Sequence, residues 1–330
     1  MTGPRSDTSL IESLSADERD LAPSAPAPTS AGAMKAMLTD ERFSDPNWIY
    51  ERKLDGIRCI AIRTGSSVKL LSRNDLSQNE RYPELVEALA KDRCDRFVID
   101  GEVVAFDGSQ TSFAKLARRG QHYVPVFYYV FDILWLEGHD VRKLPLRTRK
   151  RLLRDALEFH DHVRWTQHRN RDGEALFKEA CRKGWEGLIA KRADSPYVST
   201  RSRDWLKFKC EHGQELVIGG FTEPRGSRVE FGALLLGYYR DGRFEYAGKV
   251  GTGFDTEMLH AIADQLRQLR RKDAPFVDPG AIKERNVTWV EPKLVAEIGF
   301  TEWTRDHRLR HPRFLGLRDD KAASEVVREG

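Results

Sequence analysis

The stretch "KLDGIR" at positions 53–58 contains residues that could do chemistry together: Lys53, Asp55 and Arg58 around an Asp-Gly turn. A lysine amine attacks an electrophile only when unprotonated, and with a reference pKa of about 10.4 this costs about 4.6 kcal/mol at pH 7. Nearby cations or burial lower that cost. The spacing is therefore compatible with a nucleophilic lysine. An ordinary surface turn, with Lys53 in water, fits these few residues equally well.

Further lysines downstream help to decide between these two interpretations. In "WLKFK" at 205–209, Lys207 and Lys209 alternate with Leu206 and Phe208. A strand would place both lysines on one face, where they could converge on an anionic substrate. A solvated edge of an amphipathic strand is the alternative.

The elements that would position these residues lie between residues 34 and 209. Runs rich in β-branched and aromatic residues predict strands at 48–54, 96–106, 124–136 and 185–192. Apolar periodicity predicts helices at 82–91, 146–159 and 173–184. Pro83 marks the start of the first of these helices, and Gly184 marks the end of the last.

The pattern changes after residue 209. Strands are predicted at 216–221, 287–292 and 293–303, and a hairpin over 233–250 turns at Asp241 and Gly242. A single helix over 255–269 has Leu259, Ile262 and Leu266 on one face. Several short strands around one helix predict a small barrel of the OB type.

Composition gives the domain organisation. The chain has 330 residues, so two folded units are expected. Residues 1–33 are rich in Ser, Pro and Ala and predict a flexible N-terminal tail. The first domain is expected at 34–211 and the second at 212–330. The net charge of +4 means that any basic surface must come from local clustering.

The chain carries no sequence signal for a membrane, a metal cluster or a disulfide framework. No stretch approaches the roughly 20 apolar residues that span a bilayer, and no signal peptide is visible, so a cytoplasmic location is expected. The four cysteines contain no C-x-x-C pair, which predicts four buried or free thiols. They are Cys59, Cys94, Cys181 and Cys210.

The order of the motifs resembles that of the ATP-dependent DNA ligases, within the covalent nucleotidyltransferase superfamily. The motifs are "KLDGIR" at 53–58, "LSRN" at 71–74, "DGEVVAFD" at 100–107, "YYVFDILWL" at 128–136, "EGLIAKR" at 186–192, "WLKFK" at 205–209 and "RDDK" at 318–321. The finer resemblance is to bacterial ligase domains of non-homologous end joining. It implies an α+β fold: an adenylation domain of antiparallel sheets with helices, then a C-terminal OB-fold β-barrel.

The resemblance implies roles for the first motifs. Lys53 is expected to attack the α-phosphate of ATP and become a lysyl-adenylate. Asp55 is expected near the 3′-hydroxyl of a DNA nick, with a plain turn aspartate as the alternative. Arg58 and Arg73 suit phosphate groups, because guanidinium forks bind them in a bidentate way.

The middle motifs would hold the nucleotide and a metal ion. By resemblance Glu102 and Glu186 serve the ribose and the catalytic metal, and carboxylate oxygens suit Mg²⁺ or Mn²⁺. Phe131 would stack on adenine, although a core phenylalanine is a serious alternative. Glu51 would help to place the base.

The last motifs complete an anionic pocket. Lys191, Lys207 and Lys209 are expected around the phosphates. Arg318 and Lys321 are expected to orient the leaving pyrophosphate when the OB domain closes. Six cations lie within 305–321 against three aspartates, which favours contact with a DNA backbone.

The function that the resemblance implies is nick sealing between 3′-hydroxyl and 5′-phosphate ends through a lysyl-adenylate and a DNA-adenylate, in DNA repair, recombination or end joining. Nicked or broken double-stranded DNA is the expected substrate, and a Ku-type end-binding protein is a candidate partner. A monomer associated with the nucleoid is expected. The alternatives are an RNA ligase, a GTP-dependent capping-type enzyme and a nucleic-acid-binding module with a degenerate site. An NAD-dependent ligase is disfavoured because no four-cysteine zinc cluster is present.

Overall fold

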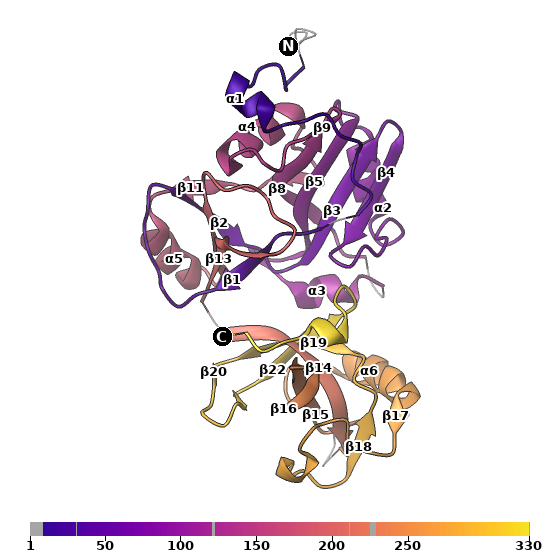
Figure 1. Ribbon diagram of the computed structural model, residues 1–330. Helices are drawn as coiled ribbons and strands as arrows, with labels where there is room; N and C mark the ends of the chain where they lie inside the picture. Colours follow the sequence, from indigo (N-terminus) through magenta and orange to yellow (C-terminus); the bar gives the residue numbers. More distant parts are fainter. Residues whose placement is uncertain (1–8, 31, 121–122, 211, 225–228, 330) are drawn as a thin grey trace. The chain divides into compact units, whose positions relative to one another are not determined.

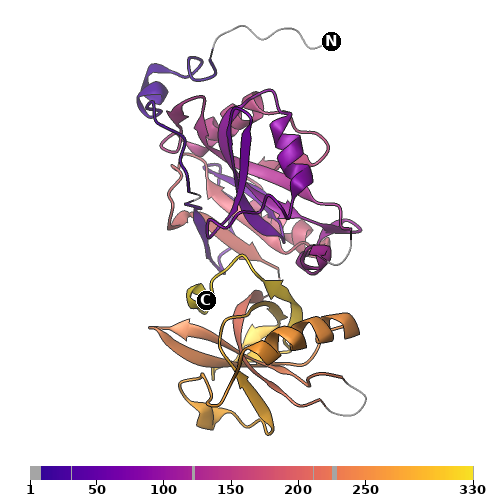
Figure 2. The same ribbon diagram turned by 90° about the vertical axis from the view of Figure 1, so that its right-hand side faces the viewer.

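The computed structural model describes residues 9–30, 32–120, 123–210, 212–224 and 229–329 (Figures 1 and 2). The chain divides into two compact units, Met1–Cys210 and Glu211–Gly330. This division lies one residue before the boundary that the sequence predicts.

Two sheets build the first unit. The first sheet has the order β1 (Lys35–Leu38), β13 (Arg201–Lys209), β12 (Gly187–Arg192), β2 (Trp48–Lys53) and β11 (His168–Asn170). The second has the order β10 (Val163–Trp165), β8 (Phe127–Leu136), β5 (Arg96–Val104), β3 (Ile57–Thr64) and β4 (Ser67–Ser72), with β9 (His139–Asp140) paired to β8. A separate hairpin joins β6 (Phe106–Asp107) and β7 (Gln110–Thr111).

The first unit also contains helices, of which those at 83–90, 146–156 and 173–182 pack against strands of these sheets. Its helices are α1 (Ala16–Asp20), α2 (Pro83–Ala90), α3 (Phe113–Ala117), α4 (Leu146–Ala156) and α5 (Gly173–Arg182), with the 3₁₀ turn η1 (Arg118–Gly120) after α3. The predicted start of α2 at Pro83 and the stop after α5 at Gly184 are confirmed, and Gly184 has a positive φ of 68°. The main core contains apolar residues of the second sheet with the buried faces of α2 and α4.

The N-terminal segment is packed rather than flexible. Ile11, Leu14 and Ala22 are buried in the main core. Ser24 forms a β-bridge with His139, and α1 carries a capping box. The prediction of a flexible tail is therefore wrong for the described part of this segment, because scattered apolar residues without a period can still dock on a preformed surface. Residues 1–8 and 31 lie outside the described residues.

The second unit is a strongly paired β-structure with one long helix. Its strands are β14 (His212–Thr222), β15 (Leu234–Arg240), β16 (Arg243–Val250), β17 (Arg270–Arg271), β18 (Val287–Val290), β19 (Val295–Phe300), β20 (Glu302–Trp303), β21 (Leu309–Arg310) and β22 (Arg313–Arg318). The helix is α6 (Thr256–Gln268), and the 3₁₀ turns are η2 (Pro279–Ala281) and η3 (Ala323–Glu325). Strand β14 pairs with β15, β18 and β19, as a closing barrel requires. The predicted α+β class with a C-terminal OB fold is confirmed.

Local signals in this unit act as the sequence predicts. Asp241 and Gly242 have φ values of 50° and 74°, which are the left-handed conformations that a tight hairpin turn needs. Helix α6 buries Leu259, Ile262 and Leu266 along one face.

A disulfide joins Cys181 on α5 to Cys210 after β13. The prediction of four thiols is therefore wrong for this pair, whereas Cys59 and Cys94 are free. The two cysteines lie 29 positions apart in the chain, but packing of α5 against the first sheet brings their Cα atoms to 5.2 Å. A pairing of this kind depends on tertiary contacts and has no local sequence pattern.

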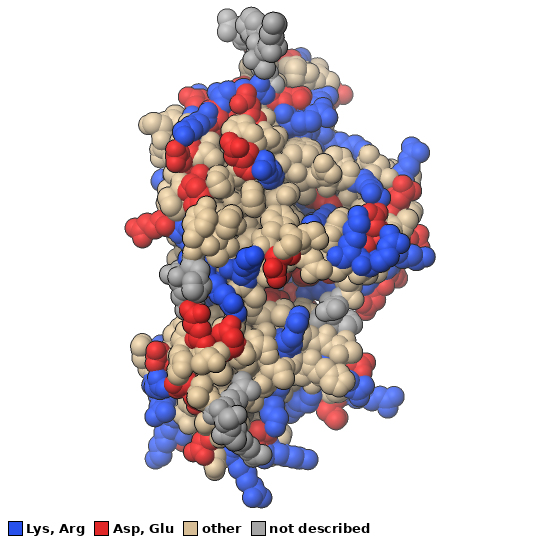
Figure 3. Space-filling view, turned by 180° about the vertical axis from the view of Figure 1, so that it is seen from behind, with Lys and Arg blue, Asp and Glu red and all other residues tan. Residues whose placement is uncertain are grey.

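The surface carries both signs of charge. On the face shown in Figure 3, Lys and Arg side chains are interspersed with Asp and Glu side chains over each unit. Among the described residues, every helix is too short or too polar to cross a lipid bilayer.

Candidate active site

One face of the first sheet gathers five of the predicted site residues. Residues paired across antiparallel strands point to the same side, so three rows of side chains cross β2, β12 and β13 together. Adjacent strands lie about 4.8 Å apart, so all three rows fit within one nucleotide-sized area. The rows are Lys53, Gly187 and Lys209; Glu51, Ile189 and Lys207; and Ile49, Lys191 and Trp205.

Lys53 forms an ion pair at the end of β2. Its Nζ atom lies 2.5 Å from Oε1 of Glu186, the residue immediately before β12. Both side chains are only partly exposed, at 18% and 26%. The second carboxylate oxygen of Glu186, Oε2, is buried without a hydrogen-bond partner among the described residues. Glu186 therefore has a ligand position that the protein itself does not fill.

The turn formed by Asp55 and Gly56 has a structural role as well as the predicted chemical role. Oδ2 of Asp55 accepts a hydrogen bond of 2.9 Å from the backbone N–H of Phe113, the first residue of α3. A Cβ atom on Gly56 would lie 2.2 Å from the carbonyl oxygen of Val103, so only glycine fits there. These contacts fix the turn that follows Lys53.

Glu51 lies at the centre of a buried charge cluster. Its carboxylate contacts Nζ of Lys150 at 2.5 Å and Nζ of Lys191 at 2.6 Å. Burial alone would raise the pKa of Glu51, but the two ammonium groups outweigh it and hold that pKa below its usual range. Burial lowers the pKa of Lys191 to about 8, against the attraction of Glu51.

His168 borders this cluster. It pairs with Glu51 across β11 and β2. Burial, together with the charge of Lys150, lowers its pKa to about 4, so the imidazole is neutral at pH 7.

Phe131 is surrounded by cations. Nζ of Lys191 lies 4.1 Å from the ring centroid, and the guanidinium carbon of Arg58 lies 4.6 Å from it. The ring also packs edge-on against Trp205 at 6.0 Å. The structure therefore brings Phe131 of the second sheet to the lysine face of the first.

Arg58 forms an ion pair with a buried carboxylate in this structure. Its Nε and Nη2 atoms each lie 2.5 Å from an oxygen of Asp100, and Nη2 also donates to the carbonyl of Met34 at 3.2 Å. The hydroxyl of Tyr197 donates to Asp100 at 2.7 Å. Burial would lower the pKa of Arg58, but Asp100 outweighs it and keeps the guanidinium charged. The predicted phosphate contact of Arg58 stays a prediction.

Two buried cations of α4 were missed by the sequence reasoning. Lys150 contacts Glu51, and Arg149 forms a fully buried bidentate pair with Asp132 at 2.8 and 3.0 Å. Their signal was present, because both residues lie on the apolar stripe of the helix between Leu146 and Leu153. A charged residue on such a stripe indicates a buried partner.

The remaining predicted site residues of the first unit lie on the second sheet or directly next to it. Glu102 is on β5 and pairs in register with Arg58 on β3, whereas Arg73 immediately follows β4. Within the described residues, no group of three or more His, Cys, Asp or Glu side chains forms a metal cage. Mg²⁺ commonly uses one or two carboxylates and completes its shell with water and phosphates. The carboxylate of Glu186 fits this pattern, because its Oε2 atom has no hydrogen-bond partner among the described residues.

Arg318 and Lys321 are paired within the second unit. Arg318 is almost fully buried and binds Asp320 through two contacts of 2.8 Å, with Glu297 at 3.2 Å. Lys321 contacts Glu215 at 3.0 Å. Both predicted pyrophosphate ligands are thus held by acidic side chains of their own unit.

A cavity of about 450 Å³ borders β2, β11 and α5. Among its described lining residues, none belongs to the predicted site. Aromatic and basic side chains form its walls, including Arg52, Tyr129 and Trp185. Three buried polar atoms of the lining have no hydrogen-bond partner in the part of the chain that the structure describes: Nε of Arg52, Oγ1 of Thr166 and Nδ1 of His168.

A lysine- and carboxylate-bearing face in a two-sheet unit, followed by an OB-fold unit, defines the covalent nucleotidyltransferase class. Residues 28–209 match the family model described as ATP dependent DNA ligase domain, and residues 227–321 match the one described as ATP dependent DNA ligase C terminal region. The chain belongs to the ATP-dependent DNA ligase family.

Known proteins place it near one branch of that family. It is 39% identical over 294 residues to the multifunctional non-homologous end joining protein LigD of Pseudomonas aeruginosa, a match that covers 86% of this chain and 35% of the relative. It is 37% identical over 287 residues to the Mycobacterium tuberculosis protein LigD, covering 86% of this chain and 37% of that one. The chain thus spans about a third of the length of these curated relatives.

A solved structure, mycobacterial DNA ligase D complexed with ATP and MES, has a TM-score of 0.66 to this chain. The two are 34% identical, and the match covers 90% of this chain and 98% of the other. The similarity therefore extends over both units.

Proposed function

We propose that this chain is an ATP-dependent DNA ligase that seals nicks between 3′-hydroxyl and 5′-phosphate ends, in DNA repair or end joining. The ion pair of Lys53 with Glu186, on a sheet face that also bears Lys191, Lys207 and Lys209, is the observation that carries the proposal. Family membership supports it.

Three displacements at phosphorus make up the reaction. Lys53, after losing a proton, attacks the α-phosphate of ATP, a phosphorus–nitrogen bond forms, and pyrophosphate leaves. An oxygen of the 5′-phosphate of the nick then attacks the phosphorus of the lysyl-adenylate, the phosphorus–nitrogen bond breaks, and Lys53 is released while the AMP passes to the DNA. Finally the 3′-hydroxyl attacks the 5′-phosphorus and AMP leaves. Such displacements depend mainly on positioning and charge neutralisation, which Lys207 and Lys209 supply on the same face.

Other residues orient the nucleotide. Phe131 stacks against the adenine, Glu51 helps to place the base, and Glu102 binds the ribose. Glu186 and Glu102 would hold Mg²⁺ or Mn²⁺. Oε2 of Glu186, which has no hydrogen-bond partner among the described residues, supports the assignment of Glu186. The ion, when bound, supplies positive charge to the phosphates.

The substrate and partner follow from the branch of the family. Nicked or broken double-stranded DNA is the proposed substrate, Asp55 and Arg73 act at the nick, and the cations of 305–321 contact its backbone. Arg318 and Lys321 leave their acidic partners to orient pyrophosphate. A Ku-type end-binding protein is the proposed partner of the monomer, and a pull-down without association, with or without DNA ends, would remove that part. The cytoplasmic, nucleoid-associated location stays a prediction.

Intact-protein mass spectrometry tests the proposal. The protein is stripped of bound AMP with pyrophosphate and then incubated with divalent metal and either ATP or GTP. We expect an AMP adduct from ATP in the wild type and in Lys69→Ala, a control at an exposed lysine of β4, and no adduct in Lys53→Ala.

The other outcomes identify the alternatives. A GMP adduct would indicate a capping-type enzyme, and adenylate transfer to nicked RNA alone would indicate an RNA ligase. The absence of any adduct in the stripped wild type would indicate a binding module with a degenerate site.

A further inference from the structure

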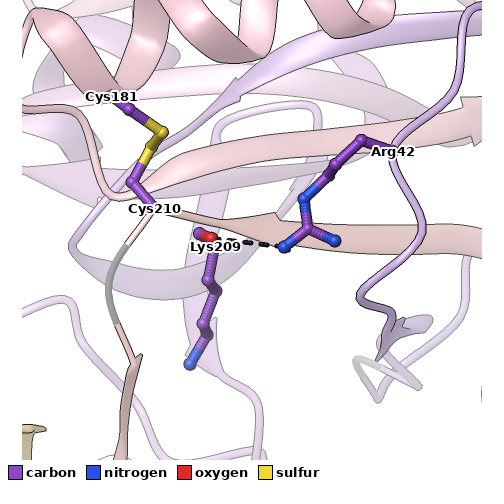
Figure 4. The surroundings of a disulfide bond; sticks show 4 residues. All are labelled: Arg42, Cys181, Lys209 and Cys210. Atoms are coloured by element: carbon purple, nitrogen blue, oxygen red, sulfur yellow. Dashed lines mark hydrogen bonds between the residues drawn. A yellow bond between two sulfur atoms is a disulfide. The ribbon is translucent and has the colours of Figure 1, made fainter. Parts of the chain in front are cut away.

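The disulfide lies at the end of the strand that closes the candidate active site. Cys210 directly follows Lys209, the last residue of β13, and is the last residue of the first unit. Its partner Cys181 is near the end of α5. In Figure 4 the bond ties the helix to the strand end, and the guanidinium of Arg42 points to the carbonyl of Lys209, 3.4 Å away.

A short chain of contacts connects this bond to the reactive lysine. The backbone N–H of Cys210 donates a hydrogen bond of 3.0 Å to the carbonyl oxygen of Glu186. The carboxylate of the same Glu186 lies 2.5 Å from Nζ of Lys53. Glu186 is therefore the single residue that connects Cys210 to the proposed nucleophile, Lys53.

The disulfide can be reached by reductants. Cys181 is exposed and Cys210 is partly exposed, and exposed disulfides are the ones most readily reduced. The two free thiols differ from this pair. Cys59 is buried, and burial raises its pKa well above the usual range, while burial raises the pKa of Cys94 to about 11. Neither is a good competitor for exchange, because the thiolate is the reactive form.

We propose that the Cys181–Cys210 disulfide is a redox-sensitive clamp that positions Glu186 against Lys53 and so controls the rate of lysine adenylation. The proposal rests on the proposed function of Lys53. In the oxidised state the bond fixes the end of β13 to α5, which keeps the Cys210 amide on Glu186. Reduction frees the strand end, and Glu186 loses part of its backbone support.

The redox step balances with an external dithiol. One of its thiolates attacks a sulfur of the protein disulfide and forms a mixed disulfide, and its second thiol then displaces the protein sulfur. The S–S bond of the protein breaks, two electrons and two protons pass to Cys181 and Cys210, and the dithiol becomes a cyclic disulfide.

The first test measures single-turnover adenylation of the full chain, stripped of AMP, in both redox states. Dithiothreitol reduces the protein, oxidised glutathione reoxidises it after the dithiothreitol has been removed, and alkylation followed by intact mass counts the thiols. We expect adenylation to slow by roughly tenfold on reduction and to recover on reoxidation, since small misplacements of a catalytic group are costly. Cys181→Ser should show the slow rate in both states, and Cys94→Ser should respond as the wild type does.

A second measurement tests the proposal without relying on the adenylation activity. Hydrogen exchange of the peptide that covers 205–212 should become faster on reduction if the Cys210 amide loses its partner. Unchanged exchange, or equal adenylation rates in the two redox states, would overturn the clamp. If the disulfide is only structural, its reduction would lower the Tm of the protein and leave the adenylation rate unchanged at temperatures below that Tm. Failure of adenylation in both redox states would instead contradict the proposed function. The hydrogen-exchange result would then still show whether the disulfide holds the Cys210 amide in place.

Discussion

Nζ of Lys53 lies 2.5 Å from Oε1 of Glu186, so the proposed nucleophile is held by a carboxylate of the residue that immediately precedes the neighbouring strand β12. We expect Glu186→Gln to slow single-turnover adenylation by roughly 100-fold, a typical cost for loss of a positioned catalytic group. The partly exposed pair should contribute less than about 1 kcal/mol to stability. Glu80→Gln, at an exposed position, is the matched control. A normal adenylation rate in Glu186→Gln would contradict its role.

The buried pair of Arg149 and Asp132 predicts a large stability effect. Arg149→Met should lower the free energy of unfolding by about 3–5 kcal/mol, because it leaves the Asp132 carboxylate buried and unpaired. Adding Asp132→Asn removes that charge and should recover part of the loss. Urea unfolding measures both, and Arg154→Met, an exposed arginine of the same helix, should change little. Additive losses in the double variant would show that the two residues are not coupled.

The depressed pKa of His168 predicts a pH dependence of stability. Its pKa is about 4 in the folded protein against 6.5 as the ordinary value. Between these values the unfolded state binds more protons, so this group makes stability fall as the pH falls from 6.5 towards 4. His168→Gln should therefore flatten the decline of the free energy of unfolding over that window, whereas His160→Gln, at an exposed position, should keep the wild-type slope. Identical slopes in all three proteins would refute this assignment.

The packed N-terminal segment predicts a difference between two leucines. Leu14 is 2% exposed within the main core, whereas Leu21 is 39% exposed. Leu14→Ala should cost about 2–5 kcal/mol, as deletion of buried methyl groups does. Leu21→Ala should stay within about 0.5 kcal/mol of the wild type. Thermal unfolding compares the two, and equal Tm values would restore the interpretation of a flexible tail.

The shared face of Lys207 and Lys209 could be predicted because both residues lie on one regular strand. Alternation in "WLKFK" places Lys207 and Lys209 on one face, and the register across β12 confirms that shared face. The partners of Arg58 and Glu51 could not be predicted in the same way. Asp100 holds Arg58, and Lys150 holds Glu51, through contacts between elements that are remote in the chain.

The sequence by itself determined the longer helices, several of the main strands, the hairpin at Asp241 and Gly242, and the order of the motifs. The helices, strands and hairpin depend on local periodicity and on turn residues with left-handed φ. Tertiary structure alone decided which charges meet. It paired Arg318 with Asp320 and joined Cys181 to Cys210, and it buried Ile11 and Leu14. Such contacts depend on how elements pack in space, since burial and Coulomb attraction act between neighbours that the chain order does not specify.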